Sequence, residues 1–310
     1  MNIPAVRGRA RIWWQQWFSG LALEQTLSGF LFASPFLVGF LVFIAFPMAY
    51  SIVLAFQKWD LISPARFIGL TNIFKMFRDP KANLSLYNSA YYTVFAVPFQ
   101  LVISFTLAML LNQPVKGRAF YRAGFYMPLI VPLVASAVVW QRVFHPEFGL
   151  MNEVLAWVGV PPQKWLWDPK LAKPAFIFMS FWMIGRQMVI FIAGLQNIPE
   201  SLLEAASIDG AGTFRRIIHV IIPLMTPMIF YNMIMAIINS FQTFVPALLM
   251  TDGGPQDATL FVVLNIYRNG FQYYNMGYAS ALAWELFVII VGFTVAQFYL
   301  SRRWVYYEVG

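Results

Sequence analysis

The sequence predicts an all-α membrane protein with six transmembrane helices. Of its 310 residues, 60% are hydrophobic and only 11% are charged, whereas about a quarter of the residues in a soluble domain are charged. A membrane-spanning helix needs about 20 consecutive, mostly apolar residues, and six stretches of the chain meet this requirement. These observations exclude an ordinary soluble domain.

The six spans are placed where charges are rarest. The first, second and fifth lie in long stretches without Asp, Glu, Lys or Arg, and the third is short and contains Pro128 and Pro132. The fourth and sixth each contain one charge, Arg186 and Glu285. Membrane helices tolerate proline where neighbouring helices satisfy the freed carbonyl groups. The predicted spans are residues 30–50, 91–111, 123–141, 174–195, 225–249 and 277–301.

Six spans put both termini on one side of the membrane. The chain then has an N-terminal segment, residues 1–26, a six-helix transmembrane domain, residues 27–301, and a tail, residues 302–310. Lys and Arg are almost evenly divided between the two sides, but on the side of the termini they stand in shorter loops close to span ends, as Arg302 and Arg303 do. The positive-inside rule therefore predicts termini in the cytoplasm.

The N-terminal segment combines basic and aromatic residues. Arg7, Arg9 and Arg11 precede Trp13 and Trp14, a pattern typical of a helix that lies in the membrane interface against lipid headgroups. A basic tail that serves only to set topology is an equally good interpretation.

The residue inventory excludes several function classes. The chain has no cysteine and two histidines, so a metal site is not expected. No Lys follows a Gly, which excludes the phosphate-binding loop of ATPases, and no clustered nucleophile, base or metal set indicates catalytic residues. A net charge of +8 on so apolar a chain favours membrane lipids as partners over nucleic acid.

The loop between the fourth and fifth spans, residues 199–223, has the strongest local pattern. Pro199 followed by an acid is a good helix start, and Gly210 and Gly212 end that helix. A second helix is predicted from about Thr213. On pattern alone, a helical hairpin at the cytoplasmic face and an element that docks on a partner are about equally good interpretations.

The same loop resembles a known motif. Glu204-Ala205-Ala206, then Gly210 and Ile222-Pro223, is similar to the EAA loop of permease subunits in binding-protein-dependent ATP-binding-cassette (ABC) importers. A longer pattern resembles the carbohydrate-uptake branch, of the maltose and glycerol-phosphate permease type; it adds Asp209, Ala211, Leu195-Gln196, Ile198-Pro199 and Asp252-Gly253-Gly254-Pro255. Departures at Val220 and Ile222 are conservative. The resemblance implies a type I ABC importer permease fold and a bacterial inner-membrane location.

The resemblance also implies partners. The loop would be a coupling helix that docks in a cleft of a cytoplasmic ATPase dimer, which would bind ATP and Mg²⁺ in place of this chain. The ATPase dimer would have two such clefts and this chain has one coupling loop, so a second, paralogous permease subunit is required. An extracytoplasmic solute-binding protein would deliver the substrate. The expected coupling residues are Glu204, Ala205, Ala206, Asp209 and Gly210, of which the small ones allow close backbone approach.

Polar residues on the fifth span predict a substrate site. Asn232, Asn239 and Thr243 are spaced so that they share one face of a continuous helix, and Ser240 borders that face. In the resembling sugar permeases, positions matching Asn239, Ser240 and Thr243 line a sugar site. The competing interpretation is that these side chains hold the helix against its neighbour.

On the fourth span, Trp182 and Arg186 are further substrate candidates. An intramembrane Arg must be paired or solvated, and Glu285 is the deep acid that can pair with it. Either Arg186 forms a structural ion pair, or it faces the cavity and binds an anionic substrate.

The predicted function is that of a non-enzymatic permease subunit that moves a sugar or oligosaccharide inward by alternating access, driven by ATP hydrolysis on a separate subunit. The alternative is a secondary, ion-coupled transporter. That class is expected to show internal repeats, interrupted helices and several intramembrane ionisable groups, a pattern that is not evident in the sequence.

Overall fold

A computed structural model describes residues 20–114 and 116–306 of the protein. The described residues fall into two units, divided between Leu54 and Ala55. Before this division, α2 (Gly20–Phe40), the π-helical turn η1 (Leu41–Ala45) and α3 (Phe46–Ala55), whose last residue begins the second unit, form one unbroken helical run, which contains the predicted first span. The predicted interfacial helix with its Arg and Trp residues lies outside the described residues, and α2 already covers residues 20–26.

The second unit is built around α5 (Pro80–Asn112), the predicted second span. The Asp79 carboxylate caps its first turn by accepting a hydrogen bond from the backbone N–H of Lys81 at 2.9 Å, and Pro80 begins the helix. Along α5, Ser89, Ala96, Ser104 and Ala108 are fully or almost fully buried, because small side chains let neighbouring helices approach closely.

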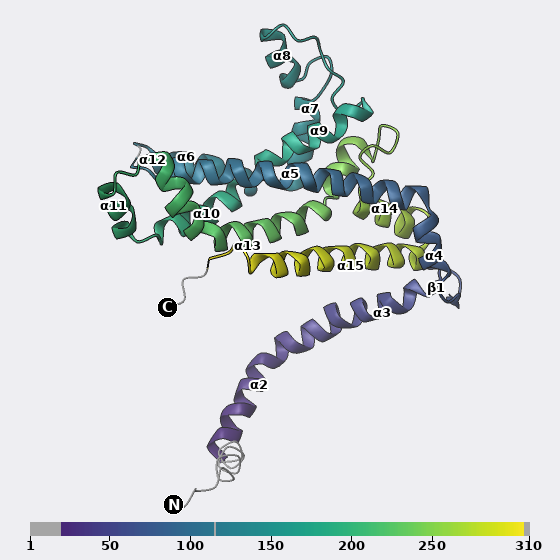
Figure 1. The fold of residues 1–310 in the computed structure, drawn as a ribbon. Coiled ribbons are helices and arrows are strands. Elements are labelled where there is room, and N and C mark those ends of the chain that lie inside the picture. The colour runs from purple at the N-terminus through teal and green to yellow at the C-terminus, as the bar shows by residue number, and fades with distance from the viewer. Residues whose placement is uncertain (1–19, 115, 307–310) are drawn as a thin grey trace, which may run out of the picture. The chain divides into compact units, whose positions relative to one another are not determined.

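Four helices make the most extensive contacts with α5, and a fifth completes the bundle. The four are α9 (Pro169–Ser180), α10 (Gly185–Gln196), α13 (Ile222–Phe241) and α14 (Val262–Tyr267). The predicted sixth span is α15 (Met276–Ser301), which packs on α13, α14 and α4 (Thr71–Arg78) (Figure 1). Phe176, Phe191 and Phe261 are among the largest fully buried side chains of the core.

Among the described residues, four helices are long and apolar enough to cross a membrane, and two bent pairs can raise the number of spans to six. The third predicted span is divided into α6 (Arg118–Tyr126) with η2 (Met127–Leu129) and α7 (Leu133–Val143), bent by 98°. The fourth is divided into α9 with η3 (Phe181–Met183) and α10, bent by 47°. The third and fourth predicted spans are therefore present as bent pairs of helices and not as single straight helices. Pro132 explains the first break, because a proline ring obstructs the helical path of the preceding turn.

The fifth predicted span also ends early. After α12 (Thr213–Arg216) and the π-helical turn η4 (Ile217–Ile221), α13 stops at Phe241, and Gln242 to Phe244 are not helical. Pro246 supplies the reason, because it lacks the N–H that would bond to the carbonyl of Gln242 and its ring would clash there. The sequence spacing predicted that Thr243 shares one continuous helix with Asn232 and Asn239. This prediction is wrong, because Thr243 lies beyond the end of α13.

Short elements that the hydropathy pattern does not predict fill the connections. β1 (Gln57–Lys58) and β2 (Arg66–Phe67) form a two-stranded antiparallel ribbon, with Gln57 opposite Phe67. α8 (Leu150–Trp157) lies in the connection between α7 and α9. The π-helical turns η5 (Ala247–Thr251) and η6 (Arg268–Gln272) flank α14, which is too short and too interrupted to give a span signal.

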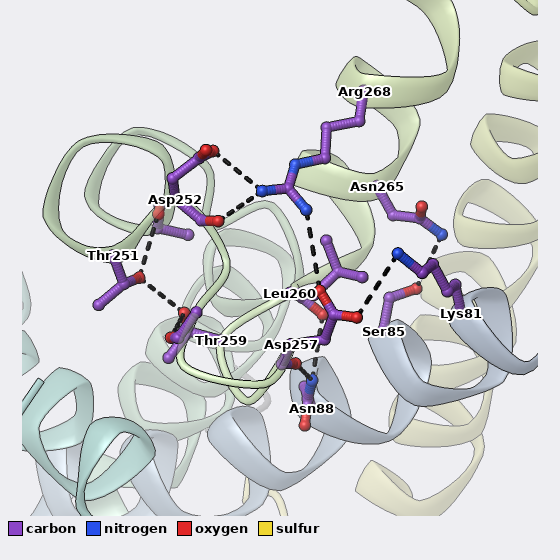
Figure 2. A network of polar contacts seen from close by, with 12 residues as sticks. Lys81, Ser85, Asn88, Thr251, Asp252, Asp257, Thr259, Leu260, Asn265 and Arg268 are labelled. Atoms are coloured by element: carbon purple, nitrogen blue, oxygen red, sulfur yellow. Dashed lines mark hydrogen bonds and ion pairs between the residues drawn. The ribbon is translucent and has the colours of Figure 1, made fainter. Parts of the chain in front are cut away.

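A polar network holds the loop that contains the Asp-Gly-Gly-Pro turn (Figure 2). The Arg268 guanidinium pairs with Asp252 at 3.1 Å and with Asp257 at 3.8 Å, and Lys81 reaches Asp257 at 3.6 Å. Asn88, on α5, donates from its amide nitrogen to the backbone carbonyls of Asp257 at 2.8 Å and Leu260 at 3.2 Å. The loop is thereby tied to the first half of α5.

Asn88 is expected to be the most sensitive member of this network. It is 0% exposed, and its amide oxygen accepts a hydrogen bond from the Lys173 ammonium at 2.9 Å. Asn88→Leu removes all three hydrogen bonds and leaves the Leu260 carbonyl without its Asn88 partner, whereas the Asp257 carbonyl keeps the Leu260 N–H at 3.1 Å. We expect the free energy of unfolding to fall by about 3 kcal/mol, since an unsatisfied buried group costs about 1–3 kcal/mol. Thermal denaturation of the purified complex measures the loss.

Asn83→Leu is the matched control, because Asn83 lies one and a half turns earlier on α5 with an exposed side chain that makes one hydrogen bond at 3.3 Å. Its melting temperature should remain near that of the wild type. Equal melting temperatures for the two variants would contradict the role assigned to Asn88.

Candidate functional site

A cavity of about 470 Å³ opens among α5, the α9–α10 pair and α13. The break after α13 contributes directly to it, because Gln242, Thr243 and Phe244 line its wall. Met179, Met183 and Met235 add flexible apolar surface. The polar and charged lining residues are Tyr92, Gln100, Ser180, Arg186, Gln187, Tyr231, Asn232, Asn239, Ser240, Gln242 and Thr243.

Two of the predicted polar residues are used in helix packing. Asn232 is 1% exposed, and its amide nitrogen donates to the backbone carbonyl of Gln187 on α10 at 3.5 Å. Ser240 is also buried, and its hydroxyl donates to Thr93 Oγ1 on α5 at 2.8 Å. Both side chains touch the cavity wall, but their hydrogen bonds join α13 to its neighbours.

Asn239 and Thr243 are more accessible. The exposed Asn239 side chain donates from Nδ2 to the carbonyl of Met235, one turn earlier on the same helix, at 2.7 Å, which leaves its amide oxygen to face the cavity. Thr243 is half-buried and lies within hydrogen-bonding reach of the Tyr92 hydroxyl. The predicted polar face therefore separates into two packing residues and two residues that a substrate can reach.

Arg186 lines the cavity with an exposed side chain. Among the described lining residues it is the one with a charged side chain. No hydrogen bond or ion pair joins its guanidinium to another residue in the part of the chain that the structure describes. The expected ion pair with Glu285 does not form. The reason lies in the packing, because α10 lies on α5 and α13 while α15, which carries Glu285, lies on α13, α14 and α4.

Trp182 does not line the cavity, although the sequence spacing placed it beside Arg186. It lies in η3, before the 47° bend, and its indole packs edge-on against Trp140 at a ring separation of 6.0 Å. Met183 of the same turn does line the cavity, so the Trp182 and Met183 side chains lie on different sides of η3.

Sequence reasoning missed Gln100, Tyr92 and Tyr231 as cavity residues. Gln100 stands inside the apolar second span, where a polar side chain is itself a signal of a bundle-facing position. Its amide oxygen accepts a hydrogen bond from Gln187 Nε2 at 3.2 Å, which joins α5 to α10 beside Arg186. The two tyrosines carried no comparable signal, because Tyr is common at many positions of membrane helices.

The EAA-like loop forms the two predicted helices. α11 (Glu200–Ile208) starts after Pro199, and Gly210 follows it with φ +75°, a left-handed conformation that favours glycine. The N–H of Ala211 donates to the carbonyl of Ala206 at 2.9 Å, and the Arg216 guanidinium donates to Ser207 Oγ at 2.9 Å. These bonds fix the turn between α11 and α12.

The outer surface of this turn is open. The side chains of Glu204, Ala205 and Asp209 are exposed, and Ala206 is half-buried. Ile208 is 87% exposed and Phe214 is 76% exposed, so two apolar side chains flank Gly210 without cover. The surface of the turn between α11 and α12 therefore combines charged, small and apolar side chains that no described residue covers.

A family model described as "Binding-protein-dependent transport system inner membrane component" matches residues 85–306. The chain belongs to this family. The matched region includes the cavity, the EAA loop and the Asp-Gly-Gly-Pro turn, so the protein is a multi-pass inner-membrane permease component of an ABC transporter and not an enzyme.

Curated relatives extend the similarity over almost the whole permease. It is 42% identical over 291 residues to the probable ABC transporter permease protein YesP of Bacillus subtilis (strain 168), covering 92% of this chain and 94% of that protein. It is 32% identical over 292 residues to the sulfoquinovosyl glycerol transport system permease protein SmoG of Agrobacterium fabrum (strain C58 / ATCC 33970), covering 93% and 94%.

The fold also matches solved structures. A chain in the crystal structure of a bacterial alginate ABC transporter in complex with alginate pentasaccharide-bound periplasmic protein superposes with a TM-score of 0.80 at 20% sequence identity, covering 91% of this permease and 96% of that chain. This agreement establishes the type I importer permease fold. The alternative of a secondary transporter is wrong, although its expected mark, interrupted helices, is present in the structure.

Proposed function

We propose that the permease moves a sugar or oligosaccharide through this cavity into the bacterial cytoplasm. The observation that carries the proposal is the lining itself, in which amide and hydroxyl groups stand beside aromatic and methionine surface. Sugars need hydrogen-bond partners for their hydroxyls and apolar contact for their C–H faces. The names of SmoG and other relatives, which include an arabinooligosaccharide permease, agree with this substrate class.

Transport by alternating access needs an energy source outside this chain. We assign the coupling role to Glu204, Ala205, Ala206, Asp209 and Gly210, which would dock in a cleft of a cytoplasmic ATPase dimer that binds ATP and Mg²⁺. Exposed Ile208 and Phe214 add apolar contact to that docking surface. Docking on the cytoplasmic ATPase would also place both termini of the six-span permease in the cytoplasm.

The remaining partners follow from the same arrangement. One docking loop on this chain and two clefts on an ATPase dimer require a second, paralogous permease subunit. A solute-binding protein would deliver the sugar at the opposite end of the bundle. Membrane lipids surround the apolar outer face, where side chains such as Phe99, Val102 and Val288 are exposed in the isolated chain.

Replacing Asn239 or Thr243 by Leu is expected to reduce sugar uptake roughly tenfold while the complex still assembles, because a lost hydrogen bond in the cavity costs about 1–2 kcal/mol. Uptake is measured in cells that contain the complete transporter, and assembly is measured by copurification of the ATPase. The contrasting variant is Asn232→Leu, which should reduce assembly because Asn232 bonds to α10. Lost assembly in Asn239→Leu and Thr243→Leu would show that these residues also serve only in packing.

A further inference from the structure

The cavity contains a positive charge that nothing in the described chain neutralises. Arg186 is exposed to the cavity without a hydrogen bond or ion pair to any described residue, and the other lining residues carry no Asp or Glu. The deep acid of the neighbouring region, Glu285 on α15, is half-buried and lies beyond ion-pair distance. No described acidic side chain therefore balances the positive charge of Arg186 in the cavity.

Two other residues of the cavity wall, Gln100 and Tyr231, offer hydrogen-bond donors. Gln100 accepts from Gln187 through its amide oxygen, so its own amide nitrogen is left to donate. The Tyr231 side chain is exposed to the cavity and offers a hydroxyl. A guanidinium, an amide N–H and a phenol O–H together match the oxygens of an anion better than the hydroxyls of a neutral sugar, which donate as well as accept.

Filling the cavity makes this imbalance costly. In the empty site water solvates the guanidinium, and a bound substrate displaces that water. A neutral sugar can accept N–H bonds from Arg186 but leaves its charge uncompensated in a site of low dielectric. An oxyanion compensates the charge and accepts two parallel N–H bonds from the planar guanidinium.

We propose that the substrate is a glycan that bears an oxyanion group, and that Arg186 is the residue that binds this group. This inference rests on the proposed carbohydrate function and specifies the class of sugar. Carboxylate, sulfate and phosphate groups share the required chemistry, and the experiment distinguishes among them.

The test is uptake from a mixed pool by cells that contain the whole transporter. The probe is a soluble hydrolysate of plant and algal cell walls supplemented with phosphorylated polyols, so that neutral, carboxylated, sulfated and phosphorylated compounds compete. Mass spectrometry follows depletion from the medium relative to a strain that lacks the permease. Wild-type cells should remove anionic compounds in preference to neutral ones of similar length, and the group on the removed compounds identifies the oxyanion.

Arg186 variants then test the assignment of the residue. Arg186→Gln should reduce anion uptake roughly tenfold or more, and Arg186→Lys, which keeps the charge but loses the planar fork, should reduce it less. Arg66→Gln is the matched control, because Arg66 is an exposed β2 residue outside the cavity lining. It should transport as the wild type does.

Several outcomes would overturn the inference. Wild-type uptake of neutral glycans alone would contradict it even if the Arg186 variants failed to assemble. An equal loss of neutral and anionic uptake in Arg186→Gln, restored by also changing Glu285→Gln, would assign Arg186 to a structural ion pair. Depletion of no glycan of either class would instead contradict the proposed carbohydrate function, so the two failures are distinct.

Discussion

Gly210→Trp is expected to abolish binding-protein-stimulated ATP hydrolysis and sugar uptake while the permease still folds. Gly210 is exposed, and a Cβ added to it would meet no atom within 4 Å, so the bulk projects outward from the turn between α11 and α12. There it would stand between Ile208 and Phe214 and hold an ATPase surface away. Coupling free energies of about 1–3 kcal/mol correspond to roughly 5- to 150-fold losses, and we expect the upper part of that range.

Two variants separate docking from backbone strain. Gly210→Ala carries only the cost of a side chain in the left-handed region, about 1–2 kcal/mol, and should retain most of the uptake. Gly159→Trp is the matched control, because Gly159 is also exposed, has the same φ of +75° and has no atom within 4 Å of an added Cβ, but it follows α8 in the connection to α9.

Retention of the ATPase on the affinity-purified permease is the deciding measurement. The ATPase should be absent from the purified Gly210→Trp permease and present with the purified Gly159→Trp permease. If Gly210→Trp retained the ATPase and hydrolysed ATP at the wild-type rate, the turn between α11 and α12 would not be the docking element.

Gly185→Ala is expected to prevent assembly of the permease. A Cβ at Gly185 would lie 2.3 Å from the carbonyl oxygen of Phe125 and 3.2 Å from the Cα of Tyr126. These are backbone atoms at the end of α6, so they cannot yield as a flexible side chain would. Overpacking typically costs about 1–3 kcal/mol, and a backbone clash at such a distance should exceed that range.

Two other glycines provide the comparison. Gly124→Ala changes the facing helix, α6, at a position with no atom within 4 Å of the new Cβ, and should leave stability near the wild-type value. Gly194→Ala on α10 meets Met228 and Met225 side chains at 2.7 Å and 2.9 Å, which can shift, so its loss should be intermediate. The yield and the melting temperature of the purified complex should be highest for Gly124→Ala, intermediate for Gly194→Ala and lowest for Gly185→Ala. A wild-type melting temperature for Gly185→Ala would mean that α6 and α10 do not pack as closely as this structure has them.

The close contact between Gly185 and α6 lies at the bend between α9 and α10. Gly185 begins α10 directly after the 47° bend, and the close approach of α6 requires the absence of a side chain at that position. Trp182 lies before the bend and outside the cavity lining, and Arg186 lies after it and within the lining.

The sequence by itself determined the approximate position of α5, α13 and α15 and the form of the EAA loop, because both depend on local properties. A long apolar segment in a membrane must form a helix, since no water is present to bond to its backbone. This placed both ends of α15 within one residue, whereas α5 begins 11 residues before its predicted start and α13 ends eight residues before its predicted end. Pro199, Gly210 and Thr213 set the limits of α11 and α12 through local backbone preferences, independent of any distant contact.

Only the tertiary structure decided which polar side chains are free. Asn232 and Asn239 are indistinguishable by spacing, yet the first is 1% exposed and bonded to α10 while the second faces the cavity. Arg186 and Glu285 are the two opposite charges within the predicted spans, but their helices have different neighbours. The physical reason is that hydropathy and periodicity measure the affinity of a segment for the membrane. Side-chain pairing depends instead on which helix faces meet, and buried small residues along α5 and α10 allow those faces to approach closely.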